Sequence, residues 1–197
     1  VERAKDAITG REREILNVEN KVEDVTQALM TMAKGSTKTE QVNELTKQII
    51  SESVAAEYAA LGITSDPMSL YENNRTMGNF GRKKKLMPTI GSWYKRLEHM
   101  AQENDNEDYR FHYSYLLKVM KQYIREFGGQ MAYFDGQSTF ELLDGAPFIN
   151  IDISQLEERF ARPLAQQILL SWIWEKFVKK NSEDRKKARQ KRVIVDE

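Results

Sequence analysis

The sequence predicts a mainly helical fold that ends in a small α/β part. In the first third of the chain, apolar residues recur at alternating spacings of three and four, and aromatic residues do so in the middle. The last quarter instead alternates a β-branched segment, a long helical segment and a second β-branched segment. We therefore expect a mostly helical domain over residues 1–130 and an α/β segment over residues 131–197.

The composition excludes several classes of protein. The 197 residues carry 30 basic and 30 acidic side chains, so the net charge argues against general binding to nucleic acid or to a membrane surface. There is no cysteine, which excludes disulfides, thiolate metal sites and cysteine nucleophiles. The longest apolar stretch, residues 168–174, is far shorter than the about 20 residues of a membrane span. The chain begins at Val1 without a targeting pattern and stops directly after an apolar segment, so we expect part of a longer protein.

Residues 10–61 predict a helical hairpin. Capping boxes of the form T-x-x-E at residues 9–12 and 37–40 open the two helices, and Gly35 and Gly62 follow them. The apolar stripes consist of Ile15, Val18, Val22, Val25, Leu29 and Met32 in the first helix, and Val42, Leu45, Ile49, Ala56 and Leu61 in the second. One interpretation is a docking arm for a partner helix. We favour the other, in which the two stripes bury each other.

Further helices are predicted over residues 90–127, after a loop-like stretch. That stretch includes the basic run Arg82 to Lys85, which we interpret as a solvated surface rather than a phosphate contact. A short helix contains Trp93, Leu97 and Met100, and a longer one ends at Gly128 and Gly129 after placing Tyr109, Tyr113, Leu116, Leu117, Met120, Ile124 and Phe127 on one side. We interpret this aromatic face as core rather than as a cofactor site.

The C-terminal part predicts a βαβ unit. Asp135 and Gly136 suit a tight turn or hairpin, and residues 148–153 read as a strand. A capping box at residues 154–157 opens a helix that extends to about Lys180, with Pro163 tilting or splitting it. The middle of that helix is apolar nearly all round, which predicts cover on more than one side. Val193 to Asp196 then form a second strand parallel to the first.

Two carboxylates, Asp196 and Glu197, follow the last predicted strand. Ligands of parallel sheets lie beyond the carboxyl ends of the strands, where Asp152 and Ser154 are also expected. An apolar strand followed by Asp-Glu is the Walker B pattern of P-loop nucleotide hydrolases, in which the Asp holds Mg²⁺ and the Glu activates water. The residues alone leave a solvated strand end equally open, because G-x-x-x-x-G-K-[ST] is absent and "GSTKTE" (residues 35–40) lacks its Gly-Lys step.

A longer stretch resembles a known family. "FINIDISQLEERFARPLAQQILLSWIWEKFVKKN", followed by "KKARQKRVIVDE", is similar to the large conjugation ATPases that energise type IV secretion systems. The resemblance covers residues 132–197 best, and "MPTIGSWYKRLE" resembles part of the helical insertion that the family carries between Walker A and Walker B. The matching residues are Leu156, Glu158, Phe160, Arg162, Pro163, Trp172, Trp174, Asp196 and Glu197.

The resemblance implies a RecA-like motor with a helical insertion and a parallel sheet, of which this chain contains part. It implies ATP and Mg²⁺ as ligands, with Asp196 directed at the metal through water and Glu197 as the catalytic base. It also implies a homo-oligomer, often hexameric, on the cytoplasmic side of the membrane, with other subunits of the apparatus as partners and DNA or protein as cargo. Walker A is missing, so we expect these residues by themselves to neither bind ATP tightly nor hydrolyse it.

Other chemistries find little support in the sequence. His99 and His112 do not have a helical metal-ligand spacing, no G-x-S-x-G is present, and the adjacent acids Glu157 and Glu158 point to different helix faces. The basic run at residues 185–192 is interpreted as a solvated loop, with DNA, acidic lipid or a neighbouring subunit as the alternative contact. Two rival functions stay open: another DNA- or protein-pumping P-loop ATPase, and a non-catalytic helical docking module.

Overall fold

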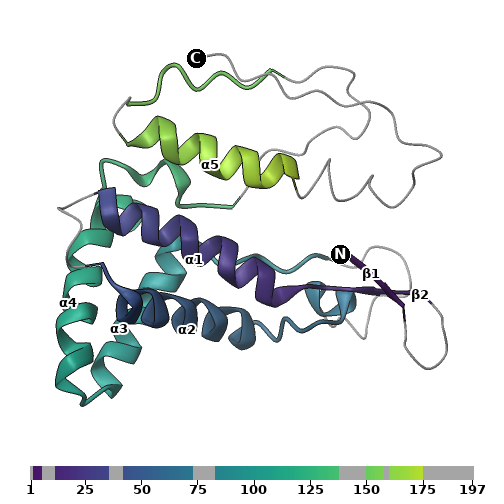
Figure 1. Ribbon diagram of the computed structural model, residues 1–197, viewed down its shortest axis with the longest axis horizontal. Coiled ribbons are helices and arrows are strands. Elements are labelled where there is room, and N and C mark those ends of the chain that lie inside the picture. The colour runs from purple at the N-terminus through teal and green to yellow at the C-terminus, as the bar shows by residue number, and fades with distance from the viewer. Residues whose placement is uncertain are drawn as a thin grey trace. The chain divides into compact units, whose positions relative to one another are not determined.

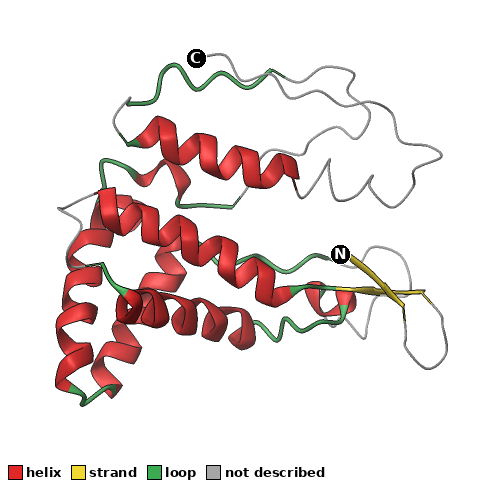
Figure 2. Cartoon of the chain, viewed as in Figure 1, coloured by secondary structure: helices red, strands yellow, loops and turns green. Residues whose placement is uncertain are grey.

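The computed structural model describes residues 2–5, 12–35, 42–72, 83–137, 150–157 and 160–174. The chain divides into two compact units, residues 1–151 and 152–197. Helices dominate the described residues, as Figure 2 shows, which confirms the prediction of a mainly helical protein. None of the described helices is long and apolar enough to cross a membrane.

The first helix, α1 (Val18–Gly35), begins later than predicted. It is preceded by two short antiparallel strands, β1 (Glu2–Lys5) and β2 (Glu12–Ile15), so the expected capping box at residues 9–12 is wrong. Asn17 caps the helix instead, because its Oδ1 accepts a hydrogen bond from the N–H of Asn20 at 3.0 Å. Residues 12–14 contain no apolar side chain that a helix could bury, which explains why the helix does not extend back through them.

The second helix, α2 (Glu44–Ala60), completes the predicted hairpin, and Figure 1 shows it running back along α1. The predicted capping box at residues 37–40 lies outside the described residues. In its place Asn43 and Thr46 form a capping box, with the Asn43 side chain accepting from the Thr46 N–H at 3.1 Å. At the other end Gly62 adopts a φ of 63°, as the sequence predicted for a helix stop.

One lysine of the basic run has a structural role that the sequence did not reveal. The Nζ of Lys85 donates a hydrogen bond at 2.6 Å to the carbonyl of Leu61, at the C-terminal end of α2. The last turn of α2 has no basic residue of its own, so Lys85 supplies the cation that favours the negative end of the helix dipole. Its neighbour Lys83 pairs with Glu72 at 3.4 Å, and η2 (Pro67–Leu70) lies just before this bridge.

Two further helices, α3 (Ile90–Glu103) and α4 (Glu107–Met120), form the other side of the first unit. The break between them falls in "NDNED", as predicted, and short 3-10 turns η3 (Lys121–Tyr123) and η4 (Arg125–Phe127) lead to Gly128. Tyr113, Leu116, Met120 and Ile124 are buried as predicted, whereas Phe127 is half exposed. The core also contains residues that the stripes did not include: Tyr94, Tyr115, Tyr123, Ile50 and Val54.

Aromatic side chains connect these helices through buried hydrogen bonds. The hydroxyls of Tyr115 and Tyr123 donate to the carbonyls of Ala33 and Met32 at 3.1 and 3.0 Å, in the last turn of α1. The indole Nε1 of Trp93 donates to the Oγ of Ser53 at 2.8 Å. Terminal carbonyls of a helix have no intrahelical partner, so the two tyrosines supply hydrogen-bond donors to the last turn of α1 and attach α4 and η3 to it.

Residues 131–137 belong to the first unit, and the chain bends at Asp135 and Gly136, where the sequence suits a tight turn or hairpin. The segment that would complete a hairpin, after residue 137, lies outside the described residues. Residues Ala132–Phe134 form a 3-10 turn, η5, after which the buried carboxylate of Asp135 accepts hydrogen bonds from the N–H groups of Gly91 and Arg125 at 2.8 and 2.9 Å. Gln137 also exchanges two hydrogen bonds with the backbone of Met87. These contacts attach residues 131–137 to the first unit.

In the second unit, α5 (Ala161–Ile173) is shorter at its start than the predicted helix. The described residues 150–153 form no strand, because Asp152 and Ser154 make a turn there instead. Pro163 lies in the first turn of α5, where its missing N–H leaves no intrahelical bond unmade, so it neither tilts nor splits the helix. Within this unit Leu170 and Trp174 are 48% and 55% exposed, so the cover expected on more than one side of the helix stays a prediction.

Candidate functional site

The predicted nucleotide-site residues Asp196 and Glu197 lie outside the described residues, as do the strand Val193–Asp196, the basic run 185–192 and residues 148–149. The parallel pairing and the Walker B assignment therefore stay predictions. Within the described ranges, no group of three or more His, Cys, Asp or Glu side chains is arranged to hold a metal ion. The two histidines have separate partners, His99 with Glu103 at 3.1 Å and His112 with Thr46 at 3.0 Å.

The residues of the family-like stretch that are described organise the start of α5. The Oε2 of Glu157 accepts hydrogen bonds from the N–H groups of Phe160 and Ala161 at 2.9 and 3.3 Å, which caps the helix. The guanidinium of Arg162 donates to the carbonyls of Ser154 and Leu156. Hydrogen bonds from Ser154 lower the pKa of Asp152, whose side chain accepts from the Ser154 N–H at 2.8 Å. These contacts shape a turn and a helix start.

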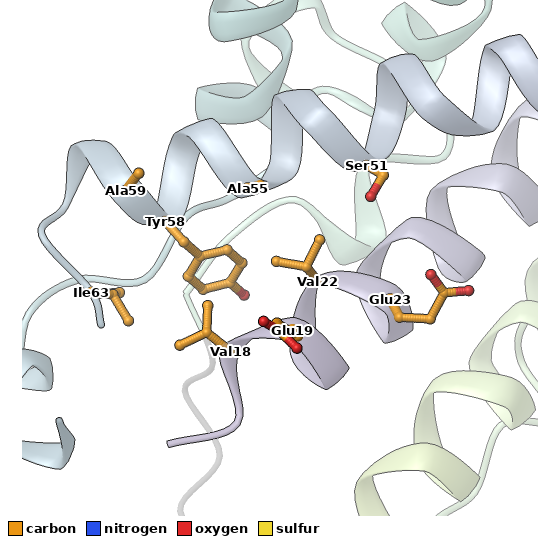
Figure 3. Close-up of a pocket in the computed structure, with 9 residues that line it drawn as sticks. All are labelled: Val18, Glu19, Val22, Glu23, Ser51, Ala55, Tyr58, Ala59 and Ile63. Carbon is orange, nitrogen blue, oxygen red and sulfur yellow. The ribbon is translucent and has the colours of Figure 1, made fainter. Parts of the chain in front are cut away.

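The first unit has a groove between α1 and α2, shown in Figure 3. Its volume is about 370 Å³. Its lining consists of Val18, Glu19, Val22 and Glu23 from α1, Ser51, Ala55, Tyr58 and Ala59 from α2, and Ile63 beyond it. The lining contains no residue of α3 or α4. We call this feature the α1–α2 groove.

Helical spacing positions both walls of the α1–α2 groove. Val18 and Val22 are one turn apart on α1, and Ala55 and Ala59 are one turn apart on α2, so each pair projects from one helix face. The alanine side chains end at Cβ, which leaves the α2 wall low and the groove open. Val22 and Ile63 are buried in its floor, whereas Ala55 and Ala59 are exposed.

The polar groups of the α1–α2 groove stand at its rim and its centre. Glu23 is engaged within the hairpin: hydrogen bonds from Gln27 and from Lys47 lower its pKa, and the Lys47 Nζ lies 3.3 Å from its carboxylate. Glu19 is exposed and has no ion pair or hydrogen bond among the described residues. Tyr58 lies across the groove beside Val18 and Val22, with its hydroxyl oxygen toward Glu19 (Figure 3). Burial raises the pKa of Tyr58, so its hydroxyl is neutral at physiological pH.

A second, smaller cavity of about 130 Å³ lies on the side of the hairpin that faces α3. Tyr58 lines both cavities, and the second also includes Val54, Trp93 and Phe134. Its one carboxylate, Glu57, is paired with Arg96 at 3.7 Å. We interpret this cavity as imperfect packing around the α3 start.

The sequence contained a partial signal for the α1–α2 groove. The predicted stripes placed Val18 and Val22 in a mutual interface, although Ala55 and Ala59, opposite them, are too small to fill it. The available clue was that small residues, Ala55 and Ala59, recur one turn apart in the second half of the predicted helix. Tyr58 belonged to neither stripe, and its position could not be predicted from spacing.

Comparison of the chain with protein-family models, curated proteins and solved structures finds no match.

Proposed function

We propose that the chain is part of an ATP-hydrolysing motor that energises conjugative DNA transfer or type IV secretion. The observation that carries the proposal is the Walker B-like segment "KRVIVDE" at residues 191–197, preceded by the family-like stretch from residue 148 onward. The helical first unit supports it, because the family has a mainly helical insertion ahead of Walker B. In this proposal α1 to α4 belong to that insertion.

The two carboxylates have distinct roles in the proposed motor. Asp196 would help to hold Mg²⁺ through water, and the metal would offset the negative charge of the ATP phosphates. Glu197 accepts a proton from the water that attacks the γ-phosphorus, while the bond to the bridging oxygen breaks and ADP leaves. The phosphate-binding loop has to come from polypeptide other than these 197 residues, because G-x-x-x-x-G-K-[ST] is not among them.

The family resemblance also supplies the setting of the proposed motor. The protein works as a homo-oligomer, often a hexamer, in the cytoplasm at the inner face of the membrane. Its partners are other subunits of the secretion or conjugation apparatus, and its cargo is DNA or protein.

The roles of Asp196 and Glu197 are tested by nucleotide binding in the protein that joins these residues to a Walker A loop. Asp196→Ala should weaken Mg²⁺-dependent ATP binding, because a metal-directed carboxylate is lost. Glu197→Gln should bind Mg²⁺-ATP as the parent does, because the amide keeps the shape of the side chain. Glu183→Gln, from the same charge-rich part of the sequence, serves as the matched control and should bind normally. Equal binding by Asp196→Ala and its parent would refute the metal role.

A further inference from the structure

The α1–α2 groove is a largely apolar surface that the described residues of the first unit leave uncovered. Its lining comes from α1, α2 and Ile63. At the opposite end of α1, Tyr115 of α4 and Tyr123 of η3 donate hydrogen bonds to the backbone. An apolar cavity of about 150 Å³ is large enough for a benzene ring. A groove of about 370 Å³ therefore has room for two side chains of that size.

The shape of the α1–α2 groove fits a helix. Two antiparallel helices leave a furrow between them in which the side-chain ridge of a third helix can lie. Ala55 and Ala59, one turn apart and exposed, allow the backbone of such a helix to approach α2 closely. A helix bound in this way presents two apolar side chains one turn apart to Val18 and Val22.

The charge at the rim of the α1–α2 groove selects among possible partners. Glu19 is an exposed carboxylate with no partner among the described residues, and the Tyr58 hydroxyl beside it has no hydrogen bond there either. Both groups accept hydrogen bonds from a cation. The rim repels phosphate, so anionic lipid and nucleic acid are disfavoured as occupants.

We propose that the α1–α2 groove binds a basic amphipathic helix of a partner protein. Two apolar side chains of that helix occupy the floor around Val22 and Ile63, and a Lys or Arg one turn further reaches Glu19 and the Tyr58 hydroxyl. The inference concerns the first unit alone and does not depend on the proposed ATPase activity, so either can fail without the other.

The test uses two designed helical peptides of equal length and the full chain. Both peptides carry the same pair of Leu residues one turn apart, and they differ only in flanking Lys or Glu. Fluorescence anisotropy should show that the Lys peptide binds more tightly than the Glu peptide. Glu19→Lys should weaken binding of the Lys peptide about 5- to 10-fold, because attraction at the rim is replaced by repulsion. The same variant should strengthen binding of the Glu peptide, because repulsion is replaced by attraction. Asp105→Lys, an equal charge change in the exposed α3–α4 loop, should alter neither affinity.

A groove-filling variant separates the apolar contribution from the charge. Ala55→Phe places a ring where the partner's apolar side chains lie, and it should abolish binding of both peptides. Circular dichroism and thermal unfolding show whether each variant is folded. If Ala55→Phe does not fold, Glu19→Lys still tests the proposal, because residue 19 is exposed and its substitution should not affect folding. Absence of peptide binding, or binding unaffected by Glu19→Lys, overturns the proposal. So does a dimer of this chain that Ala55→Phe dissociates, or tighter binding to anionic vesicles than to the Lys peptide.

Discussion

The carboxylate of Asp135 accepts a hydrogen bond at 2.8 Å from the backbone N–H of Gly91, in the first turn of α3. Its other oxygen accepts from the N–H of Arg125 at 2.9 Å, at the start of η4. The Asp135 side chain thus joins three segments that are distant in sequence. A Cβ at residue 91 would lie 3.3 Å from the carboxylate, so glycine allows this close approach.

Removal of the Asp135 carboxylate should therefore destabilise the first unit. Asp135→Ala leaves two backbone N–H groups without their acceptor, which predicts a loss of about 2–4 kcal/mol in the free energy of unfolding. Asp135→Asn keeps one acceptor oxygen, so its free energy of unfolding should fall by less. Chemical denaturation measures both, with Asp105→Asn in an exposed loop as the control. A loss below about 0.5 kcal/mol for Asp135→Ala, the range of an ordinary surface change, would contradict this role.

Two buried threonines should respond oppositely to the same substitution. Thr26 Oγ1 is buried without a hydrogen-bond partner in the described residues, so Thr26→Val should stabilise the protein by about 1 kcal/mol. Thr46 is also fully buried, but its hydroxyl lies 3.0 Å from His112 Nδ1 and takes part in the capping box of α2. Thr46→Val should therefore destabilise it by about 1–2 kcal/mol. Thermal unfolding of the two variants shows whether each substitution raises or lowers the unfolding temperature. A lower unfolding temperature for Thr26→Val would show that the Thr26 hydroxyl has a hydrogen-bond partner.

Alkaline pH should weaken the fold through buried tyrosines. Burial raises the pKa of Tyr94 to about 12 and that of Tyr123 well above its usual range. In the unfolded chain these phenols ionise near pH 10. Between pH 10 and the folded-state pKa the unfolded chain therefore binds fewer protons, so stability is intact below pH 10 and falls as the pH rises.

Phenylalanine variants isolate this pH effect from the loss of a hydrogen bond. Tyr123→Phe loses the bond to the Met32 carbonyl and should be less stable at pH 8. Its unfolding temperature should nevertheless fall less than that of the parent between pH 9 and pH 11. Tyr133→Phe, at an exposed position, is the control and should follow the parent. Parallel pH profiles for Tyr123→Phe and the parent would show that the ionisation of Tyr123 is not coupled to folding.

The helices were predictable where apolar periodicity and glycine stops coincide. Helix α1 ends at Gly35, α2 ends just before Gly62, and the break between α3 and α4 follows from "NDNED". Helix starts were predicted less well, because α1 and α5 begin several residues beyond the capping boxes predicted at residues 9–12 and 154–157. Asn17 and Asn43 cap α1 and α2 instead. Local sequence does not determine which of several polar residues becomes the cap.

The tertiary features were not predictable, since they depend on residues distant in sequence. The cap on α2 from Lys85 and the acceptor role of Asp135 each join segments that no periodicity relates. The α1–α2 groove depends on a mismatch of side-chain size across two helices, visible only once their register is known. The Walker B assignment, in contrast, depends on a local pattern, so sequence alone could suggest it.

The most direct measurement of the proposed function is the steady-state ATP turnover of Glu197→Gln, in the protein that joins these residues to a Walker A loop. We expect a loss of about 10²–10⁴-fold in turnover, because a positioned base contributes that much to proton transfer. The Glu183→Gln control should hydrolyse ATP at the parental rate. Turnover by Glu197→Gln equal to that of the parent would contradict the assignment of residues 193–197 as a Walker B segment.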